Sequence, residues 1–181
     1  GVNCHVLPDE FMPVDENGVR ADVIADNTST ISRMNLGRAY ESYLGACSRD
    51  NRTRLINYFV PKYGQSVEAV DDADLEYFRN YVTGMYELIN PDMVEFLNGL
   101  DSDGLRAHLH SVLFEDLYLY FPPDNAINIV DVIRRLEETP YKPHLGKVSY
   151  MDDLGNYVTT DENIRMGKLY FLVLEKIAND Y

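Results

Sequence analysis

The sequence predicts an α+β protein, with β-rich segments at both ends of the chain and a mostly helical segment between them. Near the N-terminus, residues 3–7 and 21–25 have the length and composition of short strands. Near the C-terminus, residues 146–160 form two alternating runs around a turn, which is typical of a β-hairpin. Between these ends, apolar residues recur at helical spacing.

The central helices are predicted from this spacing and from capping residues. Asn35 is a plausible N-cap for the first helix, Asn90-Pro91 ends one helix and begins the next, and Ser102 is a candidate cap further along. The predicted helices span residues 36–44, 52–59, 74–89, 102–113 and 127–136, and a further one begins at Asn90-Pro91. An alternating run at 117–121 predicts a strand, and the apolar run 169–177 fits either a strand buried on both faces or a core helix.

Charge is distributed unevenly along this acidic chain, whose net charge is −14. Residues 33–62 contain six basic and two acidic residues, net +4, whereas residues 65–116 contain twelve acidic and two basic residues, net −10. A chain this acidic does not bind nucleic acid by bulk attraction, because phosphate binding needs clustered lysine and arginine. The ordinary interpretation of the acidic segment is a solvated face.

Several kinds of site are disfavoured by the sequence. His108 and His110 diverge on a helix and have no third ligand nearby, and acidic pairs such as Asp152-Asp153 usually serve as caps or turn residues. We find no glycine-rich phosphate loop and no catalytic triad pattern. Two cysteines make no disulfide framework, which favours a reducing compartment, and no run approaches the length of a membrane span. The chain begins with Gly1, which suggests a piece of a longer polypeptide.

Arg33 stands immediately before a predicted helix, where the helix dipole disfavours a cation. In an ordinary domain such an arginine is solvated or pairs with a nearby carboxylate, for example that of Asp22 or Asp26. The functional alternative is a phosphate contact, because the planar guanidinium matches two phosphate oxygens. Backbone N–H groups at the start of the helix would bind the same anion.

The stretch SRMNLGRAYESYLG, residues 32–45, resembles the motif Ser-Arg-Met-Asn-x-Gly-Gln-x-x-Glu-x-x-Leu-Gly of the β subunit of multisubunit DNA-directed RNA polymerases. Residues 1–13, GVNCHVLPDEFMP, are similar to the segment that follows the family's His-Gly-Asn-Lys-Gly motif. At the other end, GKVSYMDDLGNYV resembles a hairpin of that family, and MGKLYFLVLEKIAND resembles the strand after it. The residues in register in the first motif are Ser32, Arg33, Met34, Asn35, Gly37, Glu41, Leu44 and Gly45.

This resemblance implies a role in RNA synthesis and a site. Arg33 would contact the triphosphate of the incoming nucleotide, and the supporting residues would be Ser32, Met34, Asn35, Arg38 and Glu41. The catalytic Mg²⁺ ions would be bound by aspartates of the partner β′ subunit, so that this fragment holds neither a metal ligand nor a catalytic residue and is inactive alone. The implied partners are a β′-like subunit, other polymerase subunits, a nucleoside triphosphate and the RNA–DNA hybrid, with no membrane.

The resemblance also implies a division of the chain. Residues 1–49 would supply strands of a double-psi β-barrel region and the nucleotide-contact segment, residues 50–145 a divergent acidic helical insert, and residues 146–181 a hairpin and a returning strand. The sequence departs from the family at Ile31, where the family has proline, and at Arg38, where it has glutamine. Val173 and Lys176 replace a lysine and a histidine of the family, which weakens the expectation of hybrid contacts there.

Such divergence around a kept motif is similar to the polymerases of large bacteriophages. It predicts a location in the bacterial host cytoplasm, with packaging in the virion as an alternative. A different function is also open: an acidic interaction module, in which residues 65–116 dock a polymerase subunit or another basic partner without any catalytic role. A continuous exposed acidic surface would favour docking, and a scattered one would favour solubility.

Overall fold

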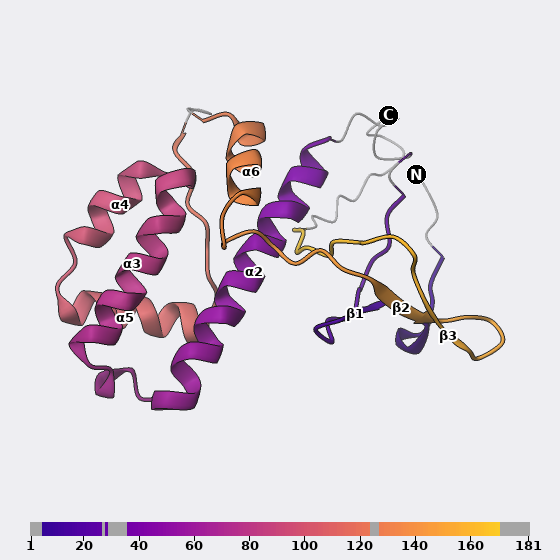
Figure 1. Ribbon diagram of the computed structural model, residues 1–181, viewed down its shortest axis with the longest axis horizontal. Coiled ribbons are helices and arrows are strands. Elements are labelled where there is room, and N and C mark those ends of the chain that lie inside the picture. Colours follow the sequence, from indigo (N-terminus) through magenta and orange to yellow (C-terminus); the bar gives the residue numbers. More distant parts are fainter. Residues whose placement is uncertain (1–4, 27, 29–35, 124–126, 171–181) are drawn as a thin grey trace, which may run out of the picture.

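The computed structural model describes residues 5–26, 28, 36–123 and 127–170 of the chain. A helical body and a small antiparallel sheet lie at opposite ends of the molecule, and one long helix, α2, runs between them (Figure 1). The architecture is therefore mixed α and β, mostly helical, as the sequence predicts. The described residues form a three-stranded sheet, and the double-psi barrel stays a prediction.

Helix α2 spans Leu36–Tyr63 and is the longest element of the structure. Two separate helices, 36–44 and 52–59, were expected here, and that prediction is wrong. Polar residues such as Asn51 interrupt the apolar periodicity, although Asn51 itself is buried. Pro61 lies in the last turn, where one missing backbone hydrogen bond costs little because the helix ends two residues later.

Three further helices build the body with α2: α3 (Asp72–Ile89), α4 (Pro91–Asn98) and α5 (Ser102–Phe114). Helix α3 packs against α4 and α5, and α5 packs against α2. Each begins at a side-chain cap that accepts a backbone N–H, which satisfies one unpaired donor of the first turn. Asp71 caps α3, Asn90 caps α4, and Asp101 caps α5. The prediction of Ser102 as the cap of α5 is therefore wrong by one residue.

After α5, residues 116–121 cross the body in an extended form on the way to α6 (Ile129–Glu137). A strand was expected at 117–121, but none of these described residues belongs to a strand. Side chains of the body bind its carbonyl groups instead: Tyr86 Oη donates to Tyr118 O at 2.8 Å, and Asn90 Nδ2 donates to Tyr120 O at 3.1 Å. Because side chains satisfy this backbone, the segment needs no partner strand.

The small sheet has the order β1-β2-β3, formed by Val14–Asp15, Val148–Met151 and Tyr157–Thr159. Both pairings are antiparallel, so the predicted hairpin at 146–160 is confirmed. The predicted strands at 3–7 and 21–25 are wrong in their described parts, which are irregular. Two 3-10 turns complete the described elements, η1 (Asp9–Phe11) and η2 (Val67–Ala69).

One apolar core, inside the helical body, dominates the molecule. Its fully buried side chains include Phe59, Phe78 and Tyr86, which come from α2 and α3. The sheet buries little apolar surface: Val148 of β2 is buried, and so is Met12, which precedes β1. The stability of the fold therefore rests mainly on the helical body, since burial of apolar surface is the dominant favourable contribution. Within the part of the chain that the structure describes, no helix has the length and apolar character to cross a membrane.

A buried carboxylate, Asp74, ties α2 to the start of α3. Tyr58 Oη donates to its Oδ1 at 2.7 Å, Lys62 Nζ lies 3.2 Å from its Oδ2, and Tyr63 Oη also donates to Oδ2. The hydrogen bonds from Tyr63 and Tyr58 lower the pKa of Asp74, because they stabilise the ionised form. The carboxylate thereby holds three residues of one helix to the next.

Replacing Asp74 with asparagine is expected to destabilise the protein in a pH-dependent way. A carboxyl group with a lowered folded-state pKa contributes stability above its unfolded pKa of about 3.9, and this contribution is lost as pH falls through the lower folded-state value. Urea unfolding of wild type and Asp74→Asn should therefore differ most above about pH 5 and converge below about pH 4. Asp153→Asn, at an exposed turn position, is the control. A pH-independent difference for Asp74→Asn would contradict this role.

Candidate functional site

The centre of the predicted nucleotide contact lies outside the described residues. This applies to Arg33 and to three of its supporting residues, Ser32, Met34 and Asn35. The described part of α2 begins at Leu36, three positions after Arg33 in the sequence. The phosphate contact therefore stays a prediction, and the geometry of the site is described from the residues that follow.

The two remaining supporting residues lie in the first turns of α2. Arg38 is exposed, and Glu41 is partly buried against the last described segment of the chain. The Glu41 carboxylate accepts a hydrogen bond from the backbone N–H of Tyr170 at 2.9 Å. Glu41 thus binds a residue 129 positions away, which gives it a structural contact with the C-terminal segment.

Two glycines allow this C-terminal segment to lie directly on α2. A Cβ atom at Gly45 would stand 2.9 Å from the backbone nitrogen of Lys168 and closer still to its carbonyl oxygen. A Cβ atom at Gly167 would overlap the backbone carbonyl of Ser42. Because neither residue has a side chain, the two backbones can touch. The sequence had Gly45 in register with the family motif, but the crossing with Gly167 could not be found without the structure.

Arg165 holds the chain in place just before the point where Gly167 and Lys168 cross α2. Its guanidinium donates to a Glu137 carboxylate oxygen at 3.0 Å and lies over the Tyr43 ring at 4.7 Å from the centroid. Glu137 ends α6, and Tyr43 belongs to α2, so one side chain joins the C-terminal segment to two helices. Burial raises the pKa of Tyr43, which keeps its hydroxyl neutral beside the carboxylate.

Arginines of the basic segment 33–62 stabilise the fold by binding backbone carbonyl groups. Arg52 donates to the carbonyl groups of Val112 and Leu113, at 2.8 and 3.0 Å, at the end of α5. Arg54 donates to the carbonyl groups of Pro140 and Lys142, at 2.6 and 2.9 Å. These two cations are therefore held by the protein's own backbone, where they complement the partial negative charge of carbonyl groups.

The histidines have structural surroundings, in line with the ordinary interpretation of their spacing. The His108 ring lies 5.7 Å from the Phe78 ring, and burial lowers the pKa of His108. The His110 ring lies 4.9 Å from that of Phe114 on another part of the surface. Across the described ranges, no three His, Cys, Asp or Glu side chains stand close enough together to hold a metal ion. Cys47 is a free, buried thiol.

Comparison with known proteins links both ends of the chain to one kind of protein. The chain is 25% identical over 190 residues to the DNA-directed RNA polymerase subunit beta of Ehrlichia ruminantium (strain Gardel) and 24% identical over 184 residues to that of Rickettsia akari (strain Hartford). The chain is similar to RNA polymerase β subunits. Each of these two alignments covers 99% of the chain and 12% of the relative. No family model matches the chain.

The alignments cover nearly all of this chain but only a small share of each relative. The chain spans about 12% of the length of the curated relatives it matches, so it corresponds to one part of a much longer β subunit. The alignments include the helical segment 50–145 as well as the two ends that carry the motifs. The identity is low, and the similarity extends over nearly every residue of the chain.

Two glycine-to-alanine substitutions on α2 test whether the C-terminal segment packs on this helix. Gly45→Ala should force the C-terminal segment away from the helix, because the added methyl group meets the Lys168 backbone. Gly37→Ala is the matched control: no described atom lies within 4 Å of a Cβ there, and alanine should stabilise the helix by about 0.5–1 kcal/mol.

Hydrogen–deuterium exchange of residues 165–170 provides the measurement. The Tyr170 amide, which donates to Glu41, should lose protection in Gly45→Ala and keep it in Gly37→Ala. Unchanged protection in Gly45→Ala would show that the backbone crossing does not hold the segment.

Proposed function

We propose that this chain is part of an RNA polymerase β-like subunit and that Arg33 positions the triphosphate of the incoming nucleotide. The observation that carries the proposal is the combination of the Ser-Arg-Met-Asn block with an alignment to β subunits over 99% of the chain. An isolated four-residue motif would be weak evidence. A motif within a continuous alignment of that extent is much more specific.

The fold supports the proposal through the arrangement of the two matched segments. Residues 32–45 and 146–170 are far apart in the sequence, yet Gly45 touches the Lys168 backbone and Glu41 binds Tyr170. The C-terminal segment lies beside the first half of α2 (Figure 1). A shared catalytic region requires such proximity of distant segments, and a chance resemblance of two separate peptides does not.

The proposed chemistry of Arg33 is electrostatic. When the RNA 3′-hydroxyl oxygen bonds to the α-phosphorus, the bond to pyrophosphate breaks and negative charge grows on the leaving group. A guanidinium placed against the β- and γ-phosphates orients the substrate and stabilises that charge. Mg²⁺, bound by aspartates of a β′-like partner, would supply the Lewis acid of the reaction. Ser32, Met34, Asn35, Arg38 and Glu41 would support the loop and the start of α2.

Other parts of the proposal follow from the same resemblance. The polymerase would include a β′-like subunit and further subunits, and its RNA–DNA hybrid would lie near the barrel region to which residues 1–49 contribute. The bacteriophage source and the cytoplasmic location stay predictions of the sequence pattern. The division into 1–49, 50–145 and 146–181 likewise stays a prediction.

Arg33→Ala in the assembled polymerase is expected to lower kcat/KM for nucleotides roughly 30-fold, which corresponds to about 2 kcal/mol of charge-assisted hydrogen bonding. Arg33→Lys should recover only part of this loss, because an ammonium group lacks the planar fork. Steady-state RNA synthesis at varied nucleotide concentration is the measurement.

Arg134→Ala is the matched control for this experiment. Arg134 is an exposed arginine of α6 that pairs with Asp131 within the same helix, so its loss should leave the nucleotide dependence unchanged. If Arg33→Ala retains the wild-type nucleotide dependence in an enzyme of normal subunit composition, the proposed phosphate contact is wrong.

A further inference from the structure

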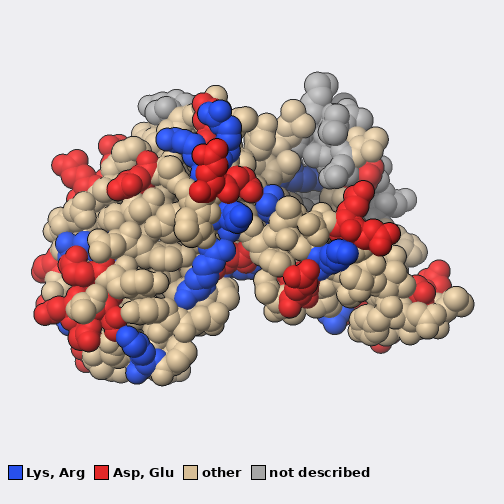
Figure 2. Space-filling model, in the orientation of Figure 1, with Lys and Arg blue, Asp and Glu red and all other residues tan. Residues whose placement is uncertain are grey.

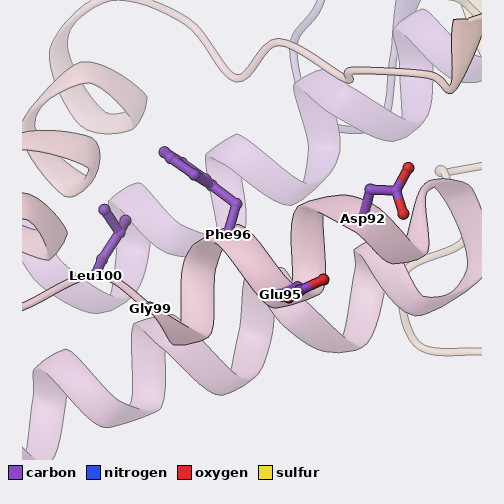
Figure 3. A pocket seen from close by; sticks show the side chains of 5 residues that line it. All are labelled: Asp92, Glu95, Phe96, Gly99 and Leu100. Carbon is purple, nitrogen blue, oxygen red and sulfur yellow. The ribbon is translucent and has the colours of Figure 1, made fainter.

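A surface of the helical body, on α4, carries an unusual aromatic residue. Phe96 lies on α4 and is 55% exposed, whereas Leu97 of the same helix is buried and Met93 and Val94 are partly buried. Phe96 lines a shallow groove together with Asp92, Glu95, Gly99 and Leu100 (Figure 3). The Phe96 and Leu100 side chains project on the same side of the chain.

The groove is open because of the way α4 ends. Gly99 follows the last residue of the helix, and a Cβ there would meet only backbone oxygens at 3.5 Å, so no side chain fills the space beside Phe96. Arg79 donates to the carbonyl groups of Asn98 and Leu100, at 3.2 and 2.9 Å, and holds this turn against α3. The groove is therefore a fixed feature of the turn between two helices.

Acidic groups surround this apolar floor. Among the described residues, neither the Asp92 nor the Glu95 carboxylate has a hydrogen-bond or ion-pair partner. Of the twelve acidic residues in segment 65–116, ten are exposed, and only Asp74 is buried. Figure 2 shows acidic side chains gathered over the end of the molecule that α4 and α5 form. Arg79, which holds the turn, donates to backbone carbonyl groups and lies 3.5 Å from the Glu76 carboxylate.

We propose that this groove docks a basic amphipathic segment of a partner protein. An apolar side chain of the partner would lie against Phe96 and Leu100, and flanking lysine or arginine residues would face Asp92 and Glu95. Exposed aromatic side chains in a groove are the usual anchors of protein interfaces, and complementary charge steers the partner and selects it. The same charge repels nucleic acid and anionic lipid, and it disfavours a second copy of this chain, whose net charge is −14.

The test uses the full chain and a synthetic helical peptide with leucines on one face and lysines on the other. Fluorescence anisotropy of the labelled peptide measures binding. Two further peptides separate the contributions: one has glutamate in place of lysine, and one has alanine in place of leucine. Binding of the leucine–lysine peptide should be at least about tenfold tighter than that of either control peptide, and it should weaken with salt.

Two variants of similar exposure place the site. Phe96→Ser should weaken binding of the leucine–lysine peptide about tenfold. Tyr120→Ser, which removes an aromatic side chain that is 53% exposed elsewhere on the surface, should leave binding unchanged. Both side chains are exposed, so neither change removes core packing, and circular dichroism confirms the fold. Equal binding by wild type and Phe96→Ser, or equal binding of the alanine–lysine peptide, would overturn the proposal.

Discussion

The structure depends on the ability of one helix to bind the backbone of segments that have no regular partner. In the middle of α2, Asn51 Nδ2 donates to Tyr141 O at 3.0 Å and to Cys47 O at 2.8 Å. Asn51 Oδ1 accepts from Tyr81 at 2.6 Å. Asp50 accepts the backbone N–H of His144 at 2.7 Å. A buried carbonyl or amide without a partner costs free energy comparable to a lost hydrogen bond, and these side chains avoid that cost for an irregular stretch of chain.

This constraint also determines where the sheet lies. Residues 140–144 are bound to α2, and β2 begins four residues later at Val148. The hairpin therefore leaves the helical body from a fixed point, although the sheet contributes little core of its own. The crossing of Gly45 with Lys168 supplies a second attachment after β3. Because the sheet is attached on both sides of the hairpin, changes in the body should be transmitted to its position.

The same contacts explain which features could be read from the sequence. The amphipathic helix α3 and the start of α4 at Pro91 follow from local rules, namely apolar spacing and capping chemistry, and both were predicted. Helix α2 was divided in two, because a buried Asn51 looks like a break in an apolar stripe until its partners Tyr81 and Tyr141 are known. The segment 117–121 alternates like a strand, but its hydrogen-bond partners are side chains. Sequence periodicity reports burial and does not report which group satisfies the backbone.

The candidate site likewise has one part that the sequence predicted and one part that only the structure reveals. The motif around Arg33 was identified from residue types alone, and its role stays a prediction. The contact of Glu41 with Tyr170 joins positions that no local pattern connects. Gly45 was known only as a motif position. A glycine is required there for a long-range reason, the approach of the Lys168 backbone, and that reason becomes visible only in three dimensions.

The basic and acidic segments of the chain have different roles in the structure. Arg52 and Arg54 of the basic segment donate to backbone carbonyl groups of the protein itself, so much of the positive charge of α2 is used in holding the chain together. The acidic residues of segment 65–116 lie mostly at the surface, where Asp71 and Asp101 also cap helices. An acidic surface on a body whose arginines bind its own backbone favours a basic protein partner and repels nucleic acid. Such a surface fits the docking partner proposed for the Phe96 groove, a basic segment of another protein.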